Sequence, residues 1–145
     1  IFLEGALQEK ERRIKKIESP DPKVFENALE EIKVFENLCY NRSLCGERDL
    51  GDILIMPKED WKVWIVDFSE AFAPRAELIP DCPISRCSKK LYQNLMNLGD
   101  DEVMAKLKLY LNDKEIQALL ERKKAIIDRI KQLIQEKGEE AVLFL

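Results

Sequence analysis

The chain has 145 residues, of which 46% are hydrophobic and 36% charged, and its 24 basic and 28 acidic residues give a net charge of −4. This length predicts a single domain over residues 1–145, and the composition excludes an intrinsically disordered chain. The mildly acidic balance argues against nucleic acid as a partner, because phosphate binding needs a basic surface. No apolar run approaches the roughly 20 residues of a membrane span, so we expect a cytoplasmic protein.

The sequence contains no histidine, which excludes Ser-His-Asp and Cys-His catalysis and histidine-ligated zinc within this chain. Acid–base or metal chemistry therefore falls to Asp, Glu, Lys, Tyr or Cys. The cysteines form no Cys-x-x-Cys pair and are too sparse for a disulfide scaffold; they are Cys39, Cys45, Cys82 and Cys87. We expect buried or free thiols in a reducing compartment, with a Cys82–Cys87 bridge as the main alternative.

Two helices are predicted in the first part of the chain. Helical spacing of apolar residues predicts the first over residues 3–18, and residues 19–22 end it. Asp21 followed by proline is typical of a new helix start, so a second helix is expected over Pro22–Tyr40. Its apolar stripe consists of Phe25, Leu29, Ile32, Phe35 and Leu38. Residues 41–51 lose the helical period and predict a loop.

Two short runs rich in β-branched and aromatic residues follow, at residues 52–56 and 61–66. The turn-like residues 57–60 between them predict a β-hairpin. Asp52 opens the first strand and Asp67 follows the second. Because the start of one strand and the end of the other are neighbours in a hairpin, we expect these two carboxylates to lie close together.

Two carboxylates held close together repel each other unless a cation lies between them. Hard cations such as Mg²⁺ and Mn²⁺ take oxygen ligands, usually together with phosphate oxygens. The pattern is therefore compatible with a metal site at one end of the hairpin. The alternative is that both acids only terminate strands in solvent.

The next part of the chain is expected to be a loop followed by two short helices. Residues 73–87 contain several prolines and little pattern, which predicts a long ordered loop. Ser88 is expected to cap a helix over residues 89–98, and Asp100 to cap a short helix over residues 101–111.

A long helix is predicted over residues 113–137. Asn112 and Glu115 form a capping-box pattern at its start, and Gly138 ends it. Its apolar stripe consists of Ile116, Leu119, Leu120, Ile126, Ile127, Ile130, Leu133 and Ile134. This stripe is expected to form the core, although it could instead pair with a second copy in a homo-oligomer. The apolar tail, residues 141–145, is expected to dock onto the body of a mainly α domain with one β-hairpin (α+β).

The hairpin and the loop before it resemble part of the kinase fold. Protein kinases carry an H-R-D-x-x-x-x-N loop, then D-F-G. Residues 45–54 (CGERDLGDIL) are similar to the G-D-R-H-x-x-N-I-L pattern of phosphatidylinositol 3- and 4-kinases, and residues 66–69 (VDFS) to their I-D-F-G. Bacterial kinase-like proteins of the HipA type share an N-x-D-R-N-x-G-N-I-L loop and a tryptophan-containing hairpin that ends in I-D-H-S/T-x-A-F, which residues 61–72 resemble.

The resemblance implies a role for each matching residue. Glu47 stands at the position of the catalytic acid, and Arg48 at that of the arginine that orders the catalytic loop. Asp49 falls where the lipid kinases have histidine. Asp52 matches the metal-binding asparagine and Asp67 the metal-binding aspartate. By this resemblance, the two aspartates hold Mg²⁺ (or Mn²⁺) against the phosphates of ATP, and Glu47 positions the acceptor hydroxyl.

The sequence departs from the kinase pattern at three positions. Glutamate in place of aspartate at Glu47 moves the carboxylate, which costs catalysis if the geometry is strict. Aspartate in place of asparagine at Asp52 adds a negative charge next to Asp67. Serine in place of glycine at Ser69 restricts the backbone. Together these changes predict a kinase that is weakened or inactive.

The resemblance assigns residues 45–54 to a catalytic loop, 52–67 to the hairpin and 88–137 to the helical remainder of a kinase C-lobe. The sequence contains no glycine-rich phosphate loop and no strand lysine with a helix glutamate partner, so the N-lobe is absent. The chain begins with Ile1, which is compatible with a fragment. By itself it is expected to bind nucleotide weakly, and to need the missing N-lobe or a protein partner. A non-catalytic scaffold module and an unrelated helical interaction domain remain as alternatives.

Overall fold

The structure is a computed structural model that describes residues 22–42, 45, 53–56 and 62–145. Within these residues the chain is mainly helical, with one β-hairpin and a second, two-residue strand pairing. The predicted fold class is therefore confirmed. The helix expected over residues 3–18 lies outside the described residues.

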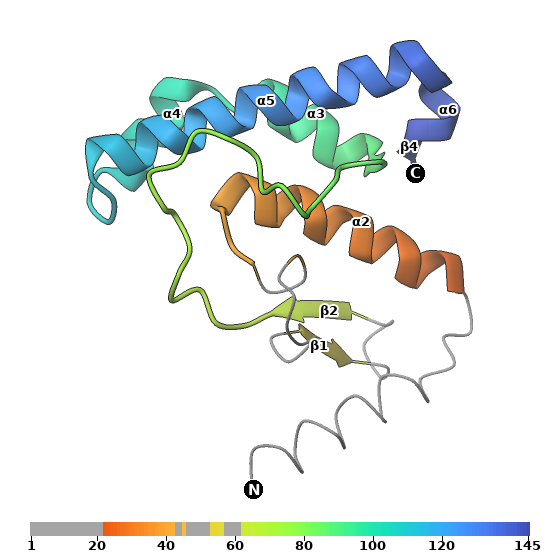
Figure 1. Ribbon diagram of the computed structural model, residues 1–145, viewed down its shortest axis with the longest axis horizontal. Coiled ribbons are helices and arrows are strands. Elements are labelled where there is room, and N and C mark those ends of the chain that lie inside the picture. Colours follow the sequence, from red (N-terminus) through yellow and green to blue (C-terminus); the bar gives the residue numbers. More distant parts are fainter. Residues whose placement is uncertain (1–21, 43–44, 46–52, 57–61) are drawn as a thin grey trace, which may run out of the picture.

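The described elements are stacked one above another (Figure 1). Helix α5 (Asp113–Lys137) lies along the top, with α2 (Pro22–Cys39) beneath it. The hairpin of β1 (Ile53–Met56) and β2 (Lys62–Ile65) lies beneath α2. Helix α2 is thus in the middle of the stack, between the hairpin and the C-terminal helices.

Helix α2 has the predicted bounds to within one residue, and Ile32 of the predicted stripe is buried, but the most deeply buried residues lie outside that stripe. Val34, Glu36 and Asn37 are almost completely buried, whereas Phe35 of the predicted stripe is 40% exposed. The reason is that α2 has two sets of neighbours. Val34 packs into the core around α5, and Asn37 is bonded to the loop that precedes α3.

The C-terminal end of α2 has the geometry of a Schellman motif. Tyr40 adopts the left-handed conformation with φ 52°, and the Asn41 N–H donates to the Glu36 carbonyl at 2.9 Å. A tyrosine in this conformation is unusual, because glycine is the ordinary residue there. Its ring is buried against Ala73 and neighbouring residues, so packing holds the turn that glycine would otherwise provide.

The hairpin has the predicted antiparallel arrangement. Ile53 pairs with Ile65, and Met56 with Lys62. Along β2 the side chains alternate between exposed and half-buried, as expected for a strand that covers a body on one face only. The register therefore brings the start of β1 and the end of β2 side by side, as the sequence predicted.

The predicted long loop over residues 73–87 is also confirmed, except at its last residue. Cys87 and Ser88 form the short strand β3, which pairs in parallel with β4 (Leu143–Phe144). The apolar tail therefore docks as predicted, and Val142 just before β4 is completely buried.

Helix α3 (Lys89–Asn97) begins where predicted, and the Ser88 hydroxyl accepts a hydrogen bond from the Leu91 N–H at 3.1 Å. The prediction that Asp100 caps the next helix is wrong by one residue. Helix α4 (Asp100–Leu107) starts at Asp100, and Gly99 is its N-cap without a side-chain hydrogen bond. The Asp100 carboxylate instead pairs with a lysine of α5, as described below.

Helix α5 has the predicted bounds and the predicted capping box. Asn112 accepts from the Glu115 N–H at 3.0 Å, and the Glu115 carboxylate accepts from the Asn112 N–H at 2.8 Å. Gly138, at φ 87°, ends the helix and leads into the short helix α6 (Glu139–Val142). The main core cluster forms around α5 and contains Val34, Ile84, Cys87, Leu95, Ile126, Ile130, Leu133, Val142 and Leu143.

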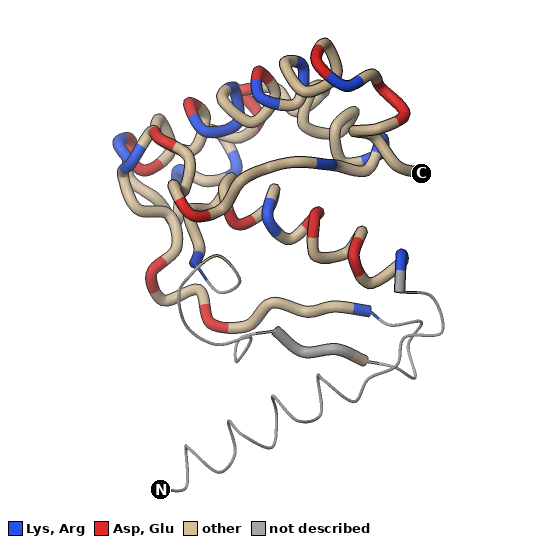
Figure 2. Tube along the Cα trace, turned by 45° about the vertical axis from the view of Figure 1, so that its right-hand side comes forward, with Lys and Arg blue, Asp and Glu red and all other residues tan. Residues whose placement is uncertain are grey.

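The exposed side of α5 carries lysines, arginines and acids in alternation (Figure 2). Among the described residues, no helix is both long enough and apolar enough to cross a membrane.

Candidate functional site

Three of the four predicted site residues lie outside the described residues: Glu47, Arg48 and Asp52. The fourth, Asp67, is described. It lies two residues after the end of β2, at the end of the hairpin where the strand register brings Ile53 opposite Ile65.

Asp67 has an unusual backbone conformation and a fixed carboxylate. Its φ is 64°, in the left-handed region that aspartate tolerates better than most residues. One carboxylate oxygen accepts a hydrogen bond from the Ser69 N–H at 3.0 Å. The hydroxyl and the amide of Ser69 hold the pKa of this exposed carboxyl below its usual value. Asp67 is therefore an ionised, solvent-accessible carboxylate in a defined position.

Ser69 does not need the conformational freedom of glycine in this structure. The left-handed non-glycine residues among those described are Tyr40, Asp67 and Phe72, and Ser69 is not one of them. Serine is thus accommodated at this position, and its amide and hydroxyl hold the Asp67 carboxylate.

The segment after Asp67 is attached to α2 at two points. The Phe68 ring contacts Phe35 edge to face, with ring centroids 6.2 Å apart. Four residues later, the Phe72 N–H donates to the Cys39 carbonyl at 2.6 Å. These contacts fix the backbone on the C-terminal side of Asp67 against α2.

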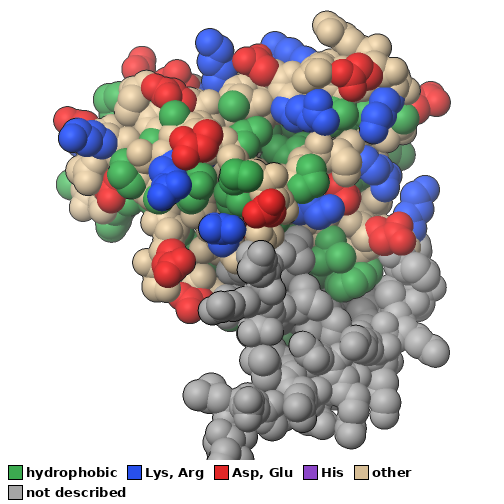
Figure 3. All heavy atoms as spheres, viewed as in Figure 1, with side chains coloured by type: hydrophobic (Ala, Val, Ile, Leu, Met, Phe, Trp, Pro, Cys, Tyr) green, Lys and Arg blue, Asp and Glu red, His purple; other side chains and the backbone are tan. Residues whose placement is uncertain are grey.

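A groove of about 810 Å³ runs between α2 and β2. Its walls are mostly apolar, with Ile32 and Phe35 on α2, Ile65 and Phe68 on or after β2, and Phe144 of the tail. Lys62 at its edge lies over the Trp64 ring, with the ammonium 4.4 Å from the ring centroid. The side of the molecule seen in Figure 3 carries basic and acidic side chains interspersed over the helices.

Arg122 connects α5 to the segment that follows Asp67. Its guanidinium donates to the carbonyls of Leu38 (3.0 Å), Ala73 (3.1 Å) and Arg75. It also lies 5.5 Å from the centroid of the Tyr40 ring. Burial lowers the pKa of this guanidinium from its ordinary value. One buried side chain therefore holds the end of α2 and the loop after the hairpin together.

Lys123, the next residue, has a similar role toward the segment between α3 and α4. Its ammonium donates to the Leu98 carbonyl at 2.6 Å and to the Asp100 carboxylate. It thereby ties the start of α4 to α5, which explains why Asp100 is not available as a cap.

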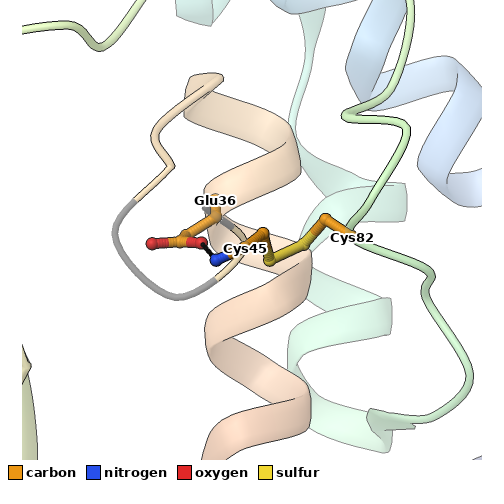
Figure 4. Close-up of side chains that lie close together, drawn as sticks. All are labelled: Glu36, Cys45 and Cys82. Atoms are coloured by element: carbon orange, nitrogen blue, oxygen red, sulfur yellow. Dashed lines mark hydrogen bonds between the residues drawn. A yellow bond between two sulfur atoms is a disulfide. The ribbon is translucent and has the colours of Figure 1, made fainter. Parts of the chain in front are cut away.

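A second group of polar side chains, buried under the end of α2, was not predicted (Figure 4). Glu36, Cys45 and Cys82 lie together there, and one ligand atom from each lies within 4.8 Å of the others. Cys45 and Cys82 form a disulfide, with their α-carbons 5.0 Å apart. The Cys45 N–H donates to the Glu36 carboxylate at 3.0 Å.

This disulfide corrects both expectations about the cysteines. Cys82 is bonded to Cys45 and not to Cys87, and only Cys39 and Cys87 are free thiols. Cys87 is unsuited to the alternative bridge because it lies in strand β3, within the main core. Burial raises the pKa of each free thiol to about 12, so both are unreactive as thiolates near neutral pH.

Asn37 organises the loop that carries Cys82. Its amide nitrogen donates to the carbonyls of Lys33 (2.9 Å) and Cys82 (3.0 Å), and its side-chain oxygen accepts from the Ile79 N–H at 2.9 Å. The sequence contained one hint of this arrangement. Two adjacent polar residues, Glu36 and Asn37, interrupt an otherwise apolar stretch of α2, as buried polar residues with specific partners often do.

Comparison with family models, with curated proteins and with solved structures finds no match to this chain.

Proposed function

We propose that the chain is the C-terminal lobe of a kinase-like phosphotransferase. In the complete protein it would transfer a phosphoryl group from ATP to a hydroxyl acceptor, with Mg²⁺ or Mn²⁺ as the metal. The observation that carries the proposal is the state of Asp67, an exposed and ionised carboxylate fixed by Ser69 after the second strand of a hairpin. Mg²⁺ takes oxygen ligands of this kind.

The remaining roles follow from the sequence resemblance. Asp67 provides one metal ligand, and Asp52 is proposed to provide the other. Glu47 is proposed to position the acceptor hydroxyl, with Arg48 ordering the loop. Bound metal would neutralise the charge of the phosphates, and positioning supplies most of the remaining catalysis in phosphoryl transfer. A cytoplasmic location, where ATP is abundant, accords with this function.

The attachment of the Asp67 segment supports this reading. A metal ligand has to be held close to its productive geometry by its surroundings. Phe68 packs on Phe35, the Phe72 N–H donates to the Cys39 carbonyl, and Arg122 holds the Ala73 carbonyl. The backbone that carries Asp67 is therefore tied to the helical body within six residues.

Metal binding by the chain tests the proposal without the N-lobe. Thermal unfolding would be followed with increasing Mn²⁺ or Mg²⁺, alone and then with ATP. A ligand that binds only the folded state at ten times its dissociation constant stabilises by about 1.4 kcal/mol. We expect Mn²⁺ to raise the melting temperature, and ATP to add to the effect.

Asp67→Asn is the decisive variant, because it removes the charge and keeps the shape. We expect it to abolish the Mn²⁺ shift. Asp128→Asn is the matched control, since Asp128 is an exposed aspartate on the far helix α5, and it should leave the shift unchanged. No shift with either metal or with ATP would contradict the phosphotransferase proposal.

A non-catalytic binding module is the second candidate, and the exposed apolar side chains of the hairpin favour it. Trp64, Val66 and Phe68 are 48%, 38% and 40% exposed, next to the apolar groove between α2 and β2. Exposed apolar side chains beside an apolar groove are typical of interaction sites. If this candidate holds, Trp64→Ser would weaken binding to the missing lobe or partner, and Asp67→Asn would not.

A further inference from the structure

The buried group of Glu36, Cys45 and Cys82 has the composition of a metal site. The three side chains come from different parts of the chain: α2, the segment after α2, and the loop before β3 (Figure 4). All three are at least nine-tenths buried. Two sulfurs and a carboxylate oxygen are a ligand set that zinc accepts.

The metal and the disulfide exclude each other, because a thiolate is the metal ligand and a disulfide sulfur is not. A dithiol reductant would interconvert the two states. It supplies two electrons and two protons, the Cys45–Cys82 bond breaks, each sulfur becomes a thiol, and the reductant's own sulfurs become a disulfide. The reduced chain then holds two thiols next to the Glu36 carboxylate.

The distances suit a tetrahedral ion with little movement. Zinc–sulfur bonds of about 2.3 Å and zinc–oxygen bonds of about 2.1 Å place neighbouring ligand atoms roughly 3.6 to 3.8 Å apart. In the structure the three ligand atoms already lie within 4.8 Å of one another. After reduction, the two sulfurs have to separate from bonding distance, and the carboxylate has to approach by about an ångström at most.

The backbone around the group is held independently of the disulfide. The Glu36 carboxylate accepts from the Cys45 N–H at 3.0 Å, and the Asn37 amide donates to the Cys82 carbonyl at 3.0 Å. These hydrogen bonds do not involve the sulfurs, so both cysteines keep their places when the bridge opens. The ligands are thus arranged before the metal arrives, which lowers the entropic cost of binding it.

We propose that Glu36, Cys45 and Cys82 of the reduced chain form a zinc site, and that oxidation to the disulfide releases the metal. On binding, the two thiols lose their protons to solvent as two zinc–sulfur bonds form. On release, the two thiolates give two electrons to a disulfide oxidant. Among the described residues no fourth His, Cys, Asp or Glu joins the group. This inference does not depend on the proposed function.

Cobalt is the probe for the test, because Co²⁺ replaces Zn²⁺ and its absorption reports thiolate ligands and tetrahedral geometry. The chain would be prepared oxidised and reduced, and titrated with Co²⁺ under anaerobic conditions. In the reduced chain we expect two kinds of absorption band, thiolate-to-cobalt charge-transfer bands and intense visible bands of tetrahedral cobalt. Both should saturate at one equivalent of Co²⁺. The oxidised chain should show neither. Zn²⁺ should abolish both bands by displacement.

The two free cysteines provide matched controls. Cys45→Ser or Cys82→Ser should abolish the bands, whereas Cys39→Ser and Cys87→Ser should retain them. Glu36→Gln should retain the thiolate bands but weaken affinity by at least about tenfold, since even outer-shell partners of metal sites are worth that much.

A second measurement needs no variant, in case the serine substitutions prevent folding. The reduced wild-type chain would be alkylated with and without Zn²⁺, and the modified cysteines identified by mass spectrometry. Zinc should slow the modification of Cys45 and Cys82 by more than tenfold and leave that of Cys39 and Cys87 unchanged. Equal protection of all four, or of none, would overturn the proposal, as would cobalt bands of equal strength in the oxidised chain.

Discussion

The helical body and the hairpin segment of this molecule differ in how they are stabilised. Around α5 the side chains are fully buried, with Ile126 and Ile130 at 0% exposure. In β2 and the residues that follow, no described side chain is fully buried up to residue 70. The hairpin segment depends on a few attachments to α2, such as the Phe35–Phe68 contact.

Because of this difference, the residues that stabilise the fold and the residue proposed to bind metal lie in different regions. The residues that carry the free energy of folding lie in the C-terminal helices and α2. Of the residues with a proposed role in phosphoryl transfer, the described one, Asp67, lies where its backbone is held but its carboxylate remains in solvent. Binding and catalytic residues are often placed this way, on loops that a rigid body positions. Four predictions test the comparison, from the largest expected effect to the smallest.

Truncation of the core should be far more costly than truncation of the hairpin. Ile130→Ala removes three carbons from a site with no exposure, so we expect a loss of about 4 kcal/mol in the free energy of unfolding. Val63→Ala, at a half-buried position of β2, should cost about 1 kcal/mol or less. Urea denaturation measures both, and equal losses would remove the distinction between the two regions.

Arg122→Met should be the most damaging substitution at a polar residue. It removes the donor to three carbonyls that join α2, α5 and the loop after the hairpin. Because those carbonyls are left without their partner, we expect a loss of about 3 kcal/mol. Arg129→Met on the same helix removes only an exposed hydrogen bond to Gln132 and should cost less than about 0.5 kcal/mol. Similar losses would show that Arg122 does not join the regions.

Ser88→Ala should have a moderate effect that stays within the helical body. The serine hydroxyl accepts from the Leu91 N–H at the start of α3, and loss of such a cap costs about 1 kcal/mol. Hydrogen exchange should become faster in the first turn of α3 and remain unchanged in β2. Faster exchange in both would indicate that the two regions unfold together.

The smallest effect concerns the pH dependence of Asp67. Its pKa is lowered in the folded chain by the hydroxyl and amide of Ser69. A carboxyl with a lowered pKa stabilises the fold above its unfolded pKa, and this contribution disappears as the pH falls through the folded pKa. Ser69→Ala should raise the pKa of Asp67 toward its usual value in an NMR titration. Glu102, whose pKa is lowered by Lys106, should not change.

The fold was largely predictable because its signals are local. The capping box of Asn112 and Glu115, the cap at Ser88 and the stripe of α5 each depend on residues within a few positions of one another. The hairpin register followed from two strands that are close together in the sequence. These interactions depend little on the rest of the chain.

The buried polar contacts could not be predicted, because they join distant parts of the sequence. Arg122 and Lys123 interrupt the apolar stripe of α5, yet nothing nearby identifies their partners at Leu38 and Leu98. The pairing of Cys45 with Cys82 likewise depends on where α2 brings the two loops together. Phe35 was placed in the core because its spacing is helical, but it lines the groove between α2 and β2 and is 40% exposed.

The bridge between Cys45 and Cys82 encloses the hairpin, Asp67 and much of the following loop in one covalent ring. A protease that cuts the backbone once within this ring, for example after the exposed Arg75, opens it without detaching either fragment. The nicked chain would migrate as one species on a gel run without thiol, and as two shorter pieces once thiol is added.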